Sequence, residues 1–180
     1  VDYWRGRFKG ARVDFSLSFG VFDNDELVAF IINGVDSHDG KHTAFNTGTG
    51  VIASHRGRQL VDKLYEYAMP FFQTANIEKC MLEVIEQNAR AIRVYERIGF
   101  SKKRRLLCFK GDLQTNISNA KVKTMPFAQL AEQANPAHHY YSWDNTNEAI
   151  SNAGDVYDTY IVKDDERKIG HFVINPKANY

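Results

Sequence analysis

The sequence predicts an α/β fold with a mixed sheet, followed by a smaller α+β piece. Three observations support this fold class. Hydrophobic residues make up 43% of the 180 residues, which is enough to bury a core and excludes a wholly disordered chain. Residues 15–109 show the order strand, strand, strand, helix, strand, helix, strand. A polar, turn-rich stretch at 112–119 then separates this part from residues 120–180.

The chain opens with a polar, basic-aromatic stretch at 1–14, where we expect a loop or the end of a helix. Strands are expected at Phe15–Phe22 and Leu27–Val35. The residues between them, Asp23-Asn24-Asp25-Glu26, favour a turn because short polar side chains bond to neighbouring backbone groups. The two strands are therefore predicted to form a hairpin.

A third strand is expected at Thr43–Ile52, after a loop at 36–41. Gly48 and Gly50 weaken this strand, and a glycine inside a strand often marks a bulge or a close approach of another group. A helix follows, and one of its faces is lined at helical spacing by Leu60, Leu64, Tyr67, Ala68 and Phe71. Pro70 falls within this pattern and predicts a kink or an early end.

Three more elements complete the first part of the chain. A short apolar strand is expected at Cys80–Ile85 and another at Leu106–Phe109. The helix between them spans Ala89–Ile98. Asn88 is a good N-cap for this helix, and Gly99 stands where a helix end needs a left-handed residue.

Residues 120–180 predict the α+β piece, with 112–119 as a linker. In chain order we expect a strand, two helices and a hairpin, at Ala120–Met125, Pro126–Ala134, Ser142–Ala153, and Val156–Val162 with Ile169–Ile174. Proline suits the first turn of a helix, and Ser142 is expected to cap the second helix.

Charge and apolar content limit the partners. Lys and Arg total 23 against 22 for Asp and Glu, and a net charge of +1 lacks the basic field that nucleic-acid binding needs. The longest apolar run, Leu27–Ile32, is far shorter than the ~20 residues of a membrane span. We therefore expect no nucleic acid and no membrane as partner.

Cys80 and Cys108 lie in apolar, strand-like segments, and we interpret them as buried, reduced thiols of a cytoplasmic protein. His138-His139 lacks the carboxylate and the spacing of a metal site, so no metal is expected.

At residues 51–61 a strand leads through a tight loop into a helix, which is an arrangement that binds anions. The first backbone N–H groups of a helix have no partners within it, and the helix dipole adds partial positive charge. Arg56 and Arg58 add full charges. The segment is either a pyrophosphate site or a solvated loop before a helix, and its residues alone leave both interpretations open.

A second segment, residues 82–100, favours the pyrophosphate site. It carries the pattern Asn-x-x-Ala-x-x-x-Tyr-x-x-x-Gly-Phe, matched by Asn88, Ala91, Tyr95, Gly99 and Phe100. This pattern resembles that of the GNAT superfamily of acetyl-coenzyme A-dependent N-acetyltransferases.

The earlier loop resembles the coenzyme-binding motif of the same family, Val-x-x-x-x-Arg-Gly-x-Gly-x-Gly/Ala. Val51, Arg56 and Gly57 match this motif. Gln59 and Val61 stand where the family has small residues. The resemblance covers about residues 15–110 and implies a mostly antiparallel twisted sheet flanked by helices.

The resemblance also implies a reaction, in which a primary amine attacks the thioester of acetyl-CoA directly. The residues that it implies for coenzyme binding are Val51, Ile52, Arg56, Gly57, Arg58, Gln59, Leu60, Val61, Asn88 and Tyr95. A backbone N–H near Val51 would polarise the thioester carbonyl, and Tyr95 would donate a proton to the leaving thiolate. Core packing is the alternative role for Tyr95, and helix capping the alternative for Asn88.

The remaining assignments stay open at this point. Glu83 precedes Asn88 where several family members place a carboxylate, so it is either the general base or an exposed strand residue. The acceptor amine belongs to a small molecule or a peptide. A catalytically weak acyl-CoA-binding sensor or scaffold is the alternative function, because Gln59 and Val61 replace small residues.

The resemblance finally predicts a domain organisation. Residues 1–111 form an acetyltransferase core, in which the 14 residues before Phe15 are too few for the family's opening strand and two helices. Residues 120–180 repeat the order of the first half of such a domain. We therefore expect part of a tandem acetyltransferase. The alternative is that 120–180 completes the first domain, within one chain or between the two chains of a homodimer.

Overall fold

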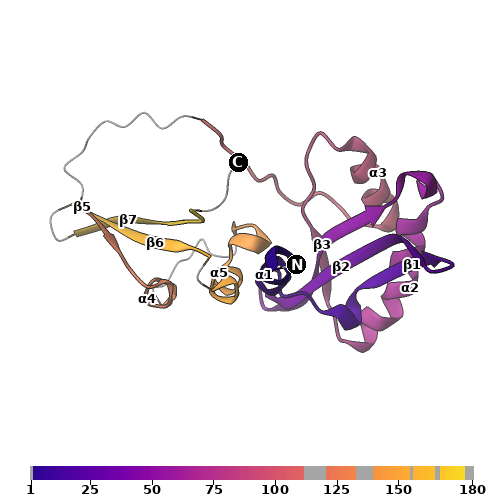
Figure 1. Ribbon diagram of the computed structural model, residues 1–180, viewed down its shortest axis with the longest axis horizontal. Coiled ribbons are helices and arrows are strands. Elements are labelled where there is room, and N and C mark those ends of the chain that lie inside the picture. The colour runs from indigo at the N-terminus through magenta and orange to yellow at the C-terminus, as the bar shows by residue number, and fades with distance from the viewer. Residues whose placement is uncertain (1, 112–120, 133–139, 155, 165–166, 177–180) are drawn as a thin grey trace. The chain divides into compact units, whose positions relative to one another are not determined.

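The computed structural model describes residues 2–111, 121–132, 140–154, 156–164 and 167–176 (Figure 1). The chain divides into two compact units, Val1–Arg104 and Arg105–Tyr180. Among the described residues, none of the helices is both long and apolar enough to cross a membrane. The predicted linker at 112–119 lies outside the described residues.

The first unit contains a sheet of four strands in the order β1-β2-β3-β4. The strands are β1 (Phe19–Asp23), β2 (Glu26–His38), β3 (Lys41–Val51) and β4 (Lys79–Leu82). Neighbours β1 and β2 are antiparallel, as are β2 and β3, whereas β4 runs parallel to β3. The prediction of an α/β fold with a mixed, mostly antiparallel sheet is confirmed, and so is the first hairpin. The strand expected from Phe15 begins only at Phe19, because residues 15–17 form a 3-10 turn.

Three helices accompany this sheet, α1 (Asp2–Gly10), α2 (Leu60–Thr74) and α3 (Ala89–Ile98). Helix α1 lies where a loop or a helix end was expected. The loop expected at 36–41 is only a tight turn, because β2 ends at His38 and β3 begins at Lys41. Asp39 and Gly40 form the turn, and both have positive φ angles (57° and 69°). Pro70 lies inside α2 and does not end it.

Helix α2 packs against β1 and β2 (Figure 1). The buried residues of this core are Leu17, Ala29, Ile31, Ala44, Leu64, Tyr65, Ala68 and Phe72. Two residues of the predicted apolar face are instead exposed, Tyr67 at 62% and Phe71 at 42%. They pack against Phe19 at the margin of the core, with ring centroids 5.7 and 5.2 Å from its ring.

The prediction of a strand at Leu106–Phe109 is wrong. Residues 101–111 have no regular secondary structure and pair with no described strand. Cys108 is exposed and free, not buried, and Phe109 is 90% exposed. An apolar segment becomes a strand only when a neighbouring strand takes its backbone hydrogen bonds. Cys80 is free and half-buried on β4, and burial raises the pKa of its thiol.

The second unit contains a three-stranded antiparallel sheet in the order β5-β6-β7. Its elements are β5 (Lys121–Thr124), α4 (Phe127–Ala131), α5 (Asn147–Ala153), β6 (Asp158–Asp164) and β7 (Arg167–Ile174). Trp143, Leu130, Ala149 and Ile161 are buried in this unit. Thr146, not Ser142, caps α5, because residues 143–145 form a short 3-10 turn before the helix. The predicted tandem arrangement stays a prediction.

Candidate functional site

The strands β3 and β4 of the first unit separate beyond Asn46 and Leu82. They pair in parallel only over Thr43–Asn46 and Lys79–Leu82. Beyond this point β3 continues to Val51, and within the described residues that stretch pairs with β2 alone. The edge of β3 that faced β4 is therefore open from Thr47 to Val51, and its outward N–H groups can bind a ligand.

A bulge lies where the strands separate. Ile32 of β2 is opposite Gly48 and Asn33 is opposite Asn46, so Thr47 is the extra residue. The adjacent Gly48 thus fulfils the prediction of a bulge. Gly50 marks a close approach, since a Cβ atom there would lie 2.5 Å from the Phe30 ring. Bulges of this kind redirect side chains beside functional sites.

A chain of buried and half-buried polar groups lies beside the bulge. Thr49 Oγ1 donates to Asn46 Oδ1 at 3.0 Å, and Asn46 Nδ2 donates to the Tyr65 hydroxyl at 2.8 Å. Burial raises the pKa of Tyr65, while the Asn46 hydrogen bond opposes that rise. Sequence analysis missed these residues, although the bulge signalled by Gly48 explains how Asn46 and Thr49 reach the same face of β3.

The loop between β3 and α2 carries the predicted basic residues. Arg56 Nε donates to the Val51 carbonyl at 3.2 Å, and Arg58 Nη2 donates to the Ser54 carbonyl at 3.3 Å. Both side chains are exposed, and Gly57 between them has φ 81°. Each arginine thus anchors one nitrogen on the loop while its charge stays at the surface.

The N-terminus of α2 lacks a side-chain cap. Gln59 occupies the cap position in the left-handed conformation, at φ 55°, and its side chain makes no capping hydrogen bond. The N–H of Lys63 donates to the Gln59 carbonyl at 3.2 Å. The N–H groups of Leu60, Val61 and Asp62 precede this first bond of the helix, where backbone donors have no partner within the helix. This end of α2 is suited to bind an anion.

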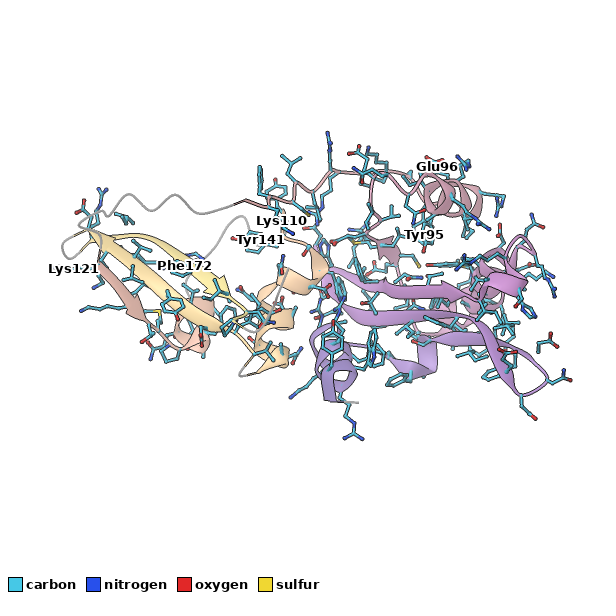
Figure 2. All side chains as sticks on the ribbon, turned by 45° about the horizontal axis from the view of Figure 1, so that its top comes forward. Tyr95, Glu96, Lys110, Lys121, Tyr141 and Phe172 are labelled. Carbon is cyan, nitrogen blue, oxygen red and sulfur yellow. The ribbon has the colours of Figure 1, made fainter. Side chains whose placement is uncertain are left out.

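Tyr95 lies on α3 and faces the sheet, whereas Glu96 lies on the opposite side of the helix (Figure 2). Tyr95 is half-buried, and its ring contacts Phe100 edge-on at a centroid distance of 5.8 Å. Phe100 contacts Tyr65 in the same way at 5.4 Å. Val51, Leu60, Val61 and Tyr95 all pack against one core cluster. Tyr95 and the start of α2 therefore contribute to the same hydrophobic core.

Helices α2 and α3 are joined by an ion pair that sequence analysis did not predict. Arg97 Nε and Nη2 donate to the two carboxylate oxygens of Asp62 at 2.6 and 2.8 Å. These hydrogen bonds hold the pKa of Asp62 below its usual value, although partial burial opposes the shift. Asp62 is the third residue of α2, and Arg97 lies in the last turn of α3.

Asn88 and Glu83 are both exposed. Asn88 caps α3 as predicted, since its Oδ1 accepts from the Ala91 N–H at 3.1 Å. Its role in coenzyme binding stays a prediction. Glu83 lies beyond β4, which ends at Leu82, so its expected place on a strand is wrong. The strand stops there because β3 and β4 separate at this point. His138 and His139 lie outside the described residues.

The chain resembles known proteins over its first part. A sequence model of the acetyltransferase (GNAT) family matches residues 2–100. Over 90 residues the chain is 27% identical to N-alpha-acetyltransferase 30 of Schizosaccharomyces pombe. That match covers 49% of this chain and 60% of the relative, so the chain spans less than two thirds of that protein.

Two solved structures show a similar arrangement. An aminoglycoside N-acetyltransferase in complex with CoA is 17% identical with a TM-score of 0.48, and the match covers 63% of this chain and 93% of that one. A chain of the NatC complex bound to Gag peptide and CoA is 25% identical with a TM-score of 0.47, over 50% of this chain and 60% of that one.

Proposed function

The chain belongs to the acetyltransferase (GNAT) family, and on this premise we propose that it transfers an acetyl group from acetyl-CoA to a primary amine. The observation that carries the proposal is the uncapped N-terminus of α2, which lies beside the open edge of β3. The uncapped helix end suits a diphosphate, and the open strand edge suits an acyl group. Tyr95 packs against the same core cluster as Val51 and Leu60.

The coenzyme would bind along these two features. Its diphosphate would accept hydrogen bonds from the N–H groups of Leu60 and Val61, in the field of the α2 dipole and of Arg56 and Arg58. Gly57 lets the backbone approach the ligand closely. The remaining residues that we assign to coenzyme contact are Val51, Ile52, Gln59, Leu60, Val61, Asn88 and Tyr95.

The reaction would be a direct transfer. The amine nitrogen attacks the thioester carbon, and a backbone N–H on the open edge of β3, near Val51, stabilises the negative charge on the carbonyl oxygen. The carbon–sulfur bond then breaks, and the Tyr95 hydroxyl donates its proton to the departing thiolate. The attacking amine must lose a proton as well. We assign the carboxylate of Glu83 as its acceptor, through water, because Glu83 is exposed at the end of β4.

For the acceptor we propose the α-amine of a peptide before the amine of a small molecule. This choice rests on the relative from Schizosaccharomyces pombe, whose name specifies N-alpha-acetylation. An acyl-CoA-binding module with weak catalysis is the second candidate function. The exposed Gln59 side chain favours it, because this side chain stands where the coenzyme would approach the backbone.

Binding and turnover together test the proposal. Calorimetry on the full chain should show heat on titration with CoA, and short peptides with free α-amines should be acetylated faster than small primary amines. CoA binding without turnover on the whole amine panel would select the binding module. The absence of both heat and a thermal shift at millimolar CoA would refute the coenzyme site itself.

A further inference from the structure

The ion pair between α2 and α3 places a carboxylate at the end of a helix that is otherwise suited to anions. Asp62 lies in the first turn of α2, and its own backbone N–H contributes to lowering its pKa. The carboxylate therefore competes for the same positive helix end that would receive a diphosphate. An unpaired Asp62 would also repel that diphosphate from within one helical turn, about 5.4 Å.

Arg97 cancels this repulsion. Its guanidinium binds both carboxylate oxygens of Asp62, with Nε 2.6 Å from Oδ1 and Nη2 2.8 Å from Oδ2. This bidentate geometry gives strong, charge-assisted hydrogen bonds. The side chains of Arg97 and Asp62 remain 47% and 25% exposed, so both lie close to the solvent that a bound coenzyme would displace. Neither residue belongs to the two sequence patterns matched above.

We infer that Arg97 sets the affinity for the diphosphate of the coenzyme by neutralising Asp62 at the start of α2. Arg97 is thus a positioning residue, since it acts through Asp62. The inference rests on the proposed function. A simpler role would be a mechanical clamp that only ties α2 to α3. The two roles predict different changes in CoA affinity. If the ion pair only tied α2 to α3, changing either partner would break the same bonds and shift the affinity in the same direction. If Arg97 neutralises Asp62, the two substitutions shift the affinity in opposite directions.

Single neutral substitutions separate these roles. Arg97→Gln leaves an unpaired negative charge at the start of α2 and should weaken CoA binding, whereas Asp62→Asn leaves an unpaired positive charge and should strengthen it. Because exposed charges are screened, each change in Kd should be roughly two- to fivefold at low salt. Both changes should shrink in 0.5 M NaCl, a concentration at which the screening length is only about 4 Å. Lys41→Gln and Asp39→Asn make the same changes of net charge at the β2–β3 turn and should leave Kd unchanged.

The exchanged pair, Asp62→Arg with Arg97→Asp, keeps an ion pair between the helices in case one single variant fails to fold. It places a positive charge on α2 and should bind CoA more tightly than the original chain. Weaker binding in both single variants, with an unchanged Kd in the exchanged pair, would refute the inference and leave the proposed function intact. A wild-type chain that does not bind CoA would refute both.

Discussion

Helix α3 begins under a side-chain cap, whereas helix α2 of the same unit begins without one. Asn88 Oδ1 accepts the N–H of Ala91 at 3.1 Å, so one donor of the first turn of α3 is used within the chain. At the start of α2, Gln59 makes no such bond and adopts a left-handed conformation with φ 55°. The N–H groups of Leu60 and Val61, which precede the first bond of the helix, can donate to a ligand, whereas the N–H of Asp62 already interacts with its own carboxylate.

The difference indicates that the two helices have different roles. A capped helix is stabilised by its own sequence, and it can hold a side chain such as Tyr95 at a fixed place. An uncapped helix gives up about 1 kcal/mol of that stabilisation and keeps its donors for an anion. We therefore expect a substitution of Tyr95, held on α3, to change the rate of the reaction, and substitutions at the start of α2 to change the affinity for the coenzyme.

The largest effect is expected from Tyr95→Phe. If the hydroxyl protonates the thiolate, its loss should lower kcat by ~10²-fold or more and leave the Kd of CoA nearly unchanged. Steady-state kinetics and calorimetry on the same preparation would measure the two quantities. Tyr67→Phe, at the exposed margin of the core, is the matched control and should keep full activity. An unchanged kcat in a folded Tyr95→Phe variant would return Tyr95 to a packing role.

A smaller effect is expected from Gly57→Ala, compared with Gly40→Ala. Both glycines have positive φ, 81° and 69°, and both have open space where a Cβ atom would stand. Each substitution should lower the free energy of unfolding by about 1 kcal/mol because alanine is strained in this conformation. Only Gly57→Ala should weaken CoA binding, by roughly tenfold, since a side chain would keep the ligand from the backbone. Equal Kd values in the two variants would place the coenzyme elsewhere.

The smallest effects are expected at the two cap positions. Asn88→Ala removes a capping hydrogen bond and should lower the free energy of unfolding by about 1 kcal/mol. Gln59→Gly removes no cap and relieves a left-handed conformation, so it should raise the free energy of unfolding by up to about 1 kcal/mol. Denaturant titrations of both variants would measure these changes. A loss of stability in Gln59→Gly would mean that the start of α2 is held by its side chain after all.

Local signals in the sequence were sufficient for several turns and helix ends around the candidate site. The cap at Asn88, the left-handed Gly99 at φ 114° and the hairpin turn after Asp23 all depend on residues within a few positions of one another. The start of α2, which we propose as the anion site, was predictable in its geometry for the same reason, since a strand, a glycine and a helix follow each other directly. Gly48 signalled the bulge, but the sequence did not show that this bulge brings Asn46 and Thr49 to the same face of β3.

Contacts between distant segments decided the rest. Tyr65 is buried and Tyr67 is exposed, and the Tyr65 hydroxyl accepts a hydrogen bond from Asn46, which lies 19 positions away in the chain. The sequence by itself determined the order of the elements from β1 to α3 and the capping of α3, since both follow from backbone preferences of neighbouring residues. Only the tertiary structure decided that Leu106–Phe109 lacks a strand partner and that Arg97 meets Asp62, because these outcomes depend on which surfaces the folded chain brings together.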